Sequence, residues 1–151
     1  MINFETILKP SCAAVRVAAA NKDEALEATV RLLASGGKVS DPAKLLEDIR
    51  AREKLSSTGI GEGVAVPHAL CEAIPETVLA VLRLAEPVDF GAIDGSPVDL
   101  IFMMAGPRGE TTLHLKLLSK LARLLHDEEF RKAARAAPDG DALARLLFER
   151  D

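Results

Sequence analysis

The sequence predicts an α/β fold in which helices pack on a mostly buried sheet. Residues 98–105, Val-Asp-Leu-Ile-Phe-Met-Met-Ala, are almost continuously apolar, which is typical of a central strand covered on both faces. Leucines at positions 113, 117, 121 and 124 recur at helical spacing and predict a long amphipathic helix directly after that strand. At 151 residues, 48% of them apolar, the chain is predicted to form one domain over residues 1–151.

Local signals divide the rest of the chain into strands and helices. Short apolar segments bounded by turn residues predict strands at 12–17, 64–66, 77–84 and 98–105, with a short extended piece at 87–90. Residues suited to helix N-caps predict helix starts at Asn21, Asp41-Pro42, Thr111 or Thr112, Asp127, and Asp139 or Asp141. The predicted fold is therefore helices on a sheet, without repeats or low-complexity segments.

The composition argues against several classes of function. The formal net charge is −4 and no block of Lys and Arg stands out, so nucleic acid is not an expected partner. No apolar run approaches the roughly 20 residues that a membrane helix needs, and Met1–Glu5 lacks the features of a signal peptide. Two distant cysteines, Cys12 and Cys71, are expected to be reduced and buried. The sequence predicts a cytoplasmic protein that does not insert into a membrane.

The stretch from Ser56 to His68, Ser-Ser-Thr-Gly-Ile-Gly-Glu-Gly-Val-Ala-Val-Pro-His, stands out from the rest. Glycines at alternate positions allow a sharp turn that exposes backbone N–H groups. A short apolar strand follows, and Pro67 stiffens its end, so we expect His68 to lie where that strand ends. A histidine beside backbone donors and hydroxyls is suited to handling an anion, with phosphate as the obvious candidate. The alternative is a tight connection with a structural histidine.

Three further residues bear on this hypothesis. His114 falls in the first turn of the predicted leucine-rich helix, where free N–H groups favour an anion nearby. Arg52 lies in the last turn of the preceding helix, beside the glycine-rich stretch, where its guanidinium could bind a phosphate. His126 falls at a helix C-terminus and is interpreted as structural. The alternative for His114 is a half-exposed helix residue without a functional role. The alternative for Arg52 is a charged residue on a solvated helix face.

Three other kinds of chemistry are weaker alternatives. His68, Cys71 and His114 could supply metal ligands, but their spacing is not that of usual zinc sites. Ser56 and Ser57 lie near the histidine, yet the chain has no Gly-x-Ser-x-Gly nucleophile elbow. A nucleotide-binding P-loop would need Gly-Lys-Ser or Gly-Lys-Thr after the glycines, which is absent.

The segment from Arg52 to His68, ending in Ala-Val-Pro-His, resembles the phosphorylation site of the IIA proteins of the bacterial phosphoenolpyruvate phosphotransferase system. The resemblance is to the fructose/mannitol type and is strongest to the nitrogen-regulatory branch. It extends over essentially the whole chain, including Ala92–Phe102 and the helix that carries His114. It implies a mixed sheet flanked by helices on both faces.

The resemblance also implies roles for individual residues. His68 matches the phosphorylated histidine, His114 the second active-site histidine, and Arg52 an arginine near the phosphoryl group. On our interpretation, backbone N–H groups of the adjoining loop add phosphoryl contacts, from Ser57, Thr58, Gly59, Gly61 and Gly63. Ala69 departs from the pattern, because the family commonly has glycine after the histidine.

The implied function is that of a phosphoryl carrier, a phosphotransferase component with a phosphohistidine intermediate. An HPr- or NPr-type phosphocarrier protein would phosphorylate His68, and no metal or organic cofactor is implied. In a regulatory role the partners would be a sensor kinase or a potassium transporter, in response to nitrogen or carbon status. The alternative is a sugar-transport component that passes the phosphoryl group to a IIB domain for fructose- or mannitol-class uptake. A domain that only binds partners is a third possibility, which the presence of Arg52, His68 and His114 disfavours.

Overall fold

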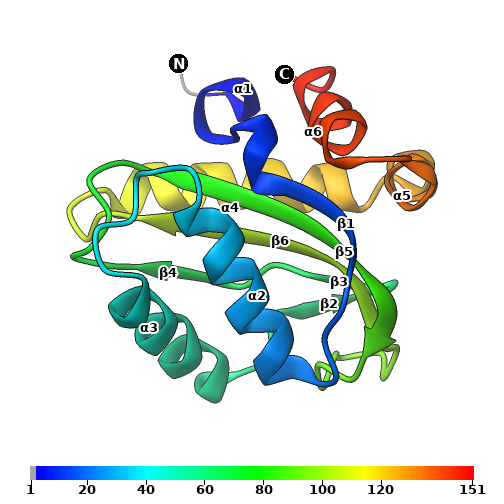
Figure 1. The fold of residues 1–151 in the computed structure, drawn as a ribbon, viewed down its shortest axis with the longest axis horizontal. Coiled ribbons are helices and arrows are strands. Elements are labelled where there is room, and N and C mark those ends of the chain that lie inside the picture. The colour runs from blue at the N-terminus through cyan, green and yellow to red at the C-terminus, as the bar shows by residue number, and fades with distance from the viewer. Residues whose placement is uncertain (1–2) are drawn as a thin grey trace.

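A computed structural model describes residues 3–151 as a mixed sheet between two layers of helices. Helices α2 (Lys22–Ala34) and α3 (Pro42–Leu55) cover the face that is nearer the viewer in Figure 1. Helix α4 (Thr111–Leu125) crosses the opposite face. This arrangement confirms the predicted α/β fold with helices on both faces.

The remaining elements complete these layers. The other helical segments are α1 (Phe4–Ile7), the 3₁₀ turn η1 (Pro10–Cys12), α5 (Glu128–Ala136) and α6 (Gly140–Phe148). The strands are β1 (Ala13–Val17), β2 (Gly59–Gly61), β3 (Val64–Ala65), β4 (His68–Leu70), β5 (Val78–Val88) and β6 (Val98–Gly106).

Strand β6 is the centre of the sheet. The order is β1-β5-β6-β3-β2, and β4 also pairs with β6. Strands β3 and β4 run parallel to β6, and β5 runs antiparallel to it. Its side chains from Leu100 to Ala105 are fully buried, as the continuous apolar run predicts for a strand covered on both faces.

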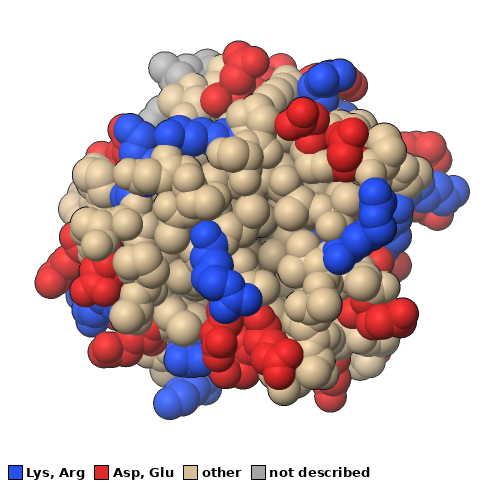
Figure 2. Space-filling model, in the orientation of Figure 1, with Lys and Arg blue, Asp and Glu red and all other residues tan. Residues whose placement is uncertain are grey.

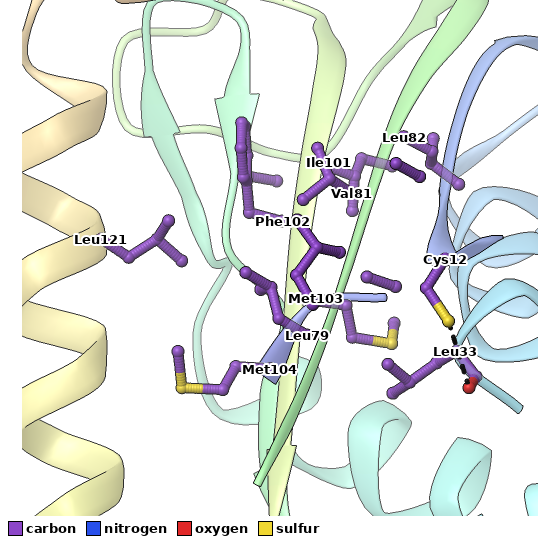
Figure 3. Packing of buried hydrophobic residues seen from close by; sticks show 14 of the residues in the cluster. Cys12, Leu33, Leu79, Val81, Leu82, Ile101, Phe102, Met103, Met104 and Leu121 are labelled. Carbon is purple, nitrogen blue, oxygen red and sulfur yellow. Dashed lines mark hydrogen bonds between the residues drawn. The ribbon is translucent and has the colours of Figure 1, made fainter. Parts of the chain in front are cut away.

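The core lies on both sides of this strand. Figure 3 shows Leu121 of α4 on one side of the sheet, and Cys12 and Leu33 on the other. The Cys12 thiol lies 3.9 Å from the Leu33 carbonyl oxygen. Cys12 and Cys71 are both buried free thiols, as the sequence predicts.

Several local predictions are confirmed by the helix caps. The side chains of Asn21, Asp41, Asp127 and Asp139 each accept a hydrogen bond from a backbone N–H in the first turn of α2, α3, α5 and α6. These bonds satisfy donors that a helix start leaves free.

Three expectations need correction. The N-cap of α4 is Glu110, without a side-chain cap bond, because the helix already begins at Thr111. Strand β5 is continuous from Val78 to Val88, where two pieces were expected, and a register shift between Arg83 and Val88 accommodates Pro87. His68 does not follow the end of a strand but is the first residue of β4. Pro67 separates β3 from β4 only briefly, because the carbonyl oxygen of Pro67 still accepts a hydrogen bond from the N–H of Met104 in β6, at 3.0 Å.

The visible surface carries charges of both signs. Figure 2 shows basic side chains interspersed with acidic ones across this face, without an extended basic region. Within the described residues, no helix has the length and apolar character needed to cross a membrane.

Candidate functional site

A surface cleft of about 510 Å³ brings together the three residues that the sequence singles out. Arg52 reaches it from α3, His68 from β4 and His114 from α4. Asp48, Leu55 and Leu115 are also part of its wall. The cleft therefore combines two imidazoles and a guanidinium from three separate elements.

The orientation of His68 is set by the backbone just before it. Its Nδ1 lies 2.8 Å from the carbonyl oxygen of Val66. A carbonyl only accepts hydrogen bonds, so Nδ1 carries the proton and donates it. The other nitrogen, Nε2, is left with its lone pair free. His68 is thus held as an imidazole with one defined nucleophilic nitrogen.

His114 lies close to His68 at the start of α4. The two ring centroids are 5.6 Å apart and the rings are tilted by 53°. The side chain of His114 is buried, and neither ring nitrogen has a hydrogen-bond partner within the described residues. A buried polar group without a partner is costly, so either ring nitrogen can form a hydrogen bond without giving up an existing one.

Burial lowers the pKa of both histidines. For His114 the pKa falls from 6.5 to about 4, through burial and through repulsion from a charged His68. For His68, burial is again the main cause that lowers the pKa, and the charge of Arg52 also lowers it. The hydrogen bond to the Val66 carbonyl and the charge of Glu53 act in the opposite direction but do not cancel the decrease. Both imidazoles are consequently neutral near pH 7, as a nucleophile and an uncharged hydrogen-bond donor require.

The low pKa of His114 predicts how stability depends on pH. Between pH 6.5 and about 4 the unfolded chain binds a proton at this residue that the folded protein resists. Stability is therefore fully present above pH 6.5 and falls as the pH drops through that window. Urea unfolding from pH 7.5 to 4.5 should show a decreasing midpoint, and His114→Gln should flatten the dependence. His126→Gln, at an exposed position, is the matched control; an equal effect of both substitutions would contradict the prediction.

Arg52 is near the histidines but bonded within its own helix terminus. Its guanidinium donates to the Ser56 carbonyl oxygen at 3.1 Å and lies 3.5 Å from the Ser56 hydroxyl oxygen. These are exposed, neutral partners, so a doubly charged anion in the cleft would compete well for the guanidinium. The bonds to Ser56 therefore do not commit Arg52 to that partner when an anion occupies the cleft.

The glycine-rich loop does not reach the cleft. None of the five predicted loop residues is part of its wall. The N–H of Thr58 donates to the Glu53 carboxylate, and that of Gly59 donates to the Ser57 hydroxyl. The chain turns at Gly61 and Gly63, both with positive φ, and joins β2 to β3. The geometry gives no support to direct phosphoryl contacts from this loop.

The loop instead contributes to the position of His68 through backbone hydrogen bonds. The carbonyl of Thr58 accepts the N–H of Val66 at 3.0 Å, and the carbonyl of Val66 holds Nδ1 of His68. Thr58 itself is fixed by Glu53, to which it donates both its N–H and its hydroxyl. A chain of hydrogen bonds therefore runs from α3 through the loop to His68.

Glu53 is a residue that sequence reasoning missed. It belongs to a charged helix end that is usually solvated, yet its side chain is only 5% exposed and pairs with Lys22 at 2.8 Å. The spacing from Glu53 to Thr58 crosses a helix terminus, so no periodic pattern signals the contact. The only sequence signal is its position inside the motif that begins at Arg52.

The alternative chemistries have little geometric support. Cys71 is fully buried and is not part of the cleft wall. Among residues 3–151, His, Cys, Asp and Glu side chains form no group of three that could hold a metal ion. The Ser57 hydroxyl donates to the carbonyl of Phe90 at 2.7 Å, away from His68.

Fold and site together define a class of α/β domain with a half-buried histidine, a second, buried histidine and an arginine in one cleft. The family described as "Phosphoenolpyruvate-dependent sugar phosphotransferase system, EIIA 2" matches residues 6–150. The chain belongs to this family.

The similar proteins include nitrogen regulatory proteins and a sugar-specific transport component. A nitrogen regulatory protein of Pseudomonas aeruginosa is 39% identical over 149 residues, which cover 99% of this chain and 97% of that protein. The crystal structure of nitrogen regulatory protein IIA-Ntr from Neisseria meningitidis superposes with a TM-score of 0.84 at 34% identity, covering 93% of this chain and 96% of the other. The fructose-specific EIIABC component of Bacillus subtilis is 38% identical over 86% of this chain, which spans only 20% of that longer protein.

Proposed function

We propose that this protein, as one domain over residues 1–151, carries a phosphoryl group on Nε2 of His68 and acts as a nitrogen-regulatory IIA protein. The observation that carries the proposal is the cleft itself. It holds an imidazole with Nδ1 bonded to the Val66 carbonyl, a second imidazole 5.6 Å away between ring centroids, and Arg52. The full-length similarity to nitrogen regulatory proteins favours the regulatory branch.

The chemistry is a transfer between two histidines. The lone pair on Nε2 of His68 attacks the phosphorus of a phosphohistidine on an HPr- or NPr-type carrier. The P–N bond to the carrier breaks, its electron pair returns to the carrier imidazole, and a new P–N bond forms to His68. Such a transfer needs positioning and charge neutralisation more than covalent assistance. Arg52 supplies charge, and His114 supplies a hydrogen bond to a phosphoryl oxygen.

The rim of the cleft suits a protein donor. Leu55 and Leu115 are 81% and 61% exposed and are both part of the cleft wall. Large exposed apolar side chains around a site are typical of protein contact surfaces. A folded phosphocarrier could bury both leucines while placing its phosphohistidine over His68, and the same surface would serve a IIB domain or a regulated target.

The proposal is tested by phosphorylation from phosphoenolpyruvate with enzyme I and an HPr- or NPr-type carrier. We expect acid-labile phosphate on the wild-type protein, with faster transfer from the carrier of the nitrogen branch. The second assay adds a fructose-type or mannitol-type IIB domain and measures onward transfer.

The two assays separate the alternatives. Rapid onward transfer to a IIB domain would favour the sugar-transport role over the regulatory one. Failure to accept phosphate from carriers of both branches would contradict the phosphoryl-carrier function, and would leave a domain that only binds partners.

A further inference from the structure

Buried polar atoms without partners gather around Gly106, at the end of β6. Among the described residues, four buried side-chain nitrogen and oxygen atoms lack a hydrogen-bond partner. Three of them belong to two residues, Oγ1 of Thr77 and both ring nitrogens of His114. Thr77 directly precedes β5, whose Val78 pairs with Ala105 of β6. The hydroxyl therefore lies beside the sheet end that packs against His114.

The absence of a side chain at Gly106 leaves room between these atoms. A Cβ placed on Gly106 would lie 3.0 Å from Oγ1 of Thr77 and 3.5 Å from Nδ1 of His114. The φ of Gly106 is not in the left-handed region, so the turn geometry does not demand glycine there. Because glycine has no side chain, the Thr77 hydroxyl oxygen and Nδ1 of His114 border the same small space beside Gly106.

We propose that Thr77 is a positioning residue for His114, whose Nδ1 accepts a hydrogen bond from the Thr77 hydroxyl across this space, directly or through one water molecule. The bond keeps the proton of the neutral imidazole on Nε2. The inference deepens the proposed function, because it assigns the group that makes His114 a donor toward a phosphoryl group on His68.

The direction of the bond follows from the chemistry of imidazole. At neutral pH His114 is uncharged, because burial lowers its pKa to about 4. A neutral imidazole has one N–H donor and one acceptor. If Nδ1 carried the proton, Nε2 would present a lone pair to the phosphoryl oxygens and repel them. A hydroxyl that donates to Nδ1 selects the tautomer that attracts them.

The energetic argument points the same way. Thr77 is 5% exposed and so is His114. Leaving a buried hydroxyl and a buried imidazole nitrogen unpaired is unfavourable, and pairing them removes both penalties together. Buried sites that are polar and large enough commonly hold a bridging water that does this.

The test is the tautomeric state of His114 in the unphosphorylated protein, measured from ¹⁵N chemical shifts of the ring nitrogens at pH 7. Wild type and Thr77→Ser, which keeps the hydroxyl, should show Nε2–H on His114 and an unprotonated, hydrogen-bonded Nδ1. Thr77→Val, which keeps the shape but removes the hydroxyl, should shift the Nδ1 resonance and raise the Nδ1–H fraction. Phosphoryl transfer to His68 should slow by about threefold to tenfold in Thr77→Val alone, as expected for one hydrogen bond.

The outcomes are separable from those of the proposed function. An Nδ1–H tautomer of His114 in wild type, or unchanged His114 shifts in Thr77→Val, would overturn the role of Thr77, whatever the transfer assay shows. If Thr77→Val does not fold, an Nδ1–H tautomer of His114 in wild type or in Thr77→Ser would still overturn the role of Thr77, and Thr77→Ala, which also lacks the hydroxyl, takes the place of Thr77→Val. If the tautomers behave as expected but no carrier phosphorylates the protein, the contact stands and the proposed function fails.

Discussion

Replacing His68 by alanine is expected to abolish phosphorylation entirely. The substitution removes the imidazole that lines the cleft and whose Nδ1 is bonded to the Val66 carbonyl oxygen. His114 does not replace it, because this side chain is 5% exposed and an incoming carrier cannot approach it in line. Incubation with phosphoenolpyruvate, enzyme I and a phosphocarrier should therefore label wild type and leave His68→Ala at background.

His126→Ala is the matched control for this experiment, since it removes an exposed histidine from the far end of α4. It should label at the wild-type rate. Stable labelling of His68→Ala would show that another residue accepts the phosphoryl group, and the assignment of the nucleophile would be wrong.

Replacing His114 by alanine is expected to slow phosphoryl transfer about 10- to 100-fold without abolishing it. A hydrogen bond to a charged group contributes about 1.5–3 kcal/mol, and each 1.4 kcal/mol of lost transition-state stabilisation costs about tenfold in rate. The nucleophile remains in place, because His68 is held by Val66 and not by His114. Stopped-flow or quenched-flow labelling at saturating carrier would measure the rate.

Two readouts distinguish this effect from a general loss of structure. The thermal unfolding midpoint shows whether His114→Ala is folded at the assay temperature. The dependence of the transfer rate on carrier concentration shows whether the carrier still binds. A folded variant with unchanged apparent affinity and a wild-type transfer rate would exclude a role for His114 in the transfer step.

Much of the fold could be predicted from local sequence patterns. Apolar runs and helix caps act within a few residues, so β6 and the starts of α2 and α3 follow from the sequence directly. The meeting of Arg52, His68 and His114 was predicted through resemblance to a family. No periodicity could have shown it, because the three residues come from separate elements that only the sheet topology brings together.

Other features depend on contacts between distant residues. Helix α1 is only four residues long, and the N–H of Phe4 donates to the side chain of Asp151 at 2.7 Å, across almost the full chain. The structural role of the glycine-rich loop could not be predicted from the sequence either. Glycines that expose N–H groups favour an anion site, but here Glu53 and Ser57 already occupy the donors of Thr58 and Gly59.

Ala69, which stands where the family commonly has glycine, fits the structure without strain. Among the described non-glycine residues only Arg16 and Glu62 have positive φ. Ala69 lies in β4, is buried and pairs with Ala105 of β6. A methyl group is therefore compatible with the strand that carries His68, and the backbone at the site does not require glycine at this position.

The most direct test of the account is to identify the phosphorylated nitrogen in the wild-type protein. Transfer from a phosphorylated HPr- or NPr-type carrier, followed by ³¹P and ¹⁵N NMR of the product, reports both the residue and the ring position. The account predicts one phosphohistidine, on Nε2 of His68, with Nδ1 still bonded to the Val66 carbonyl. Phosphate on Nδ1 of His68, on another residue, or on none would contradict it.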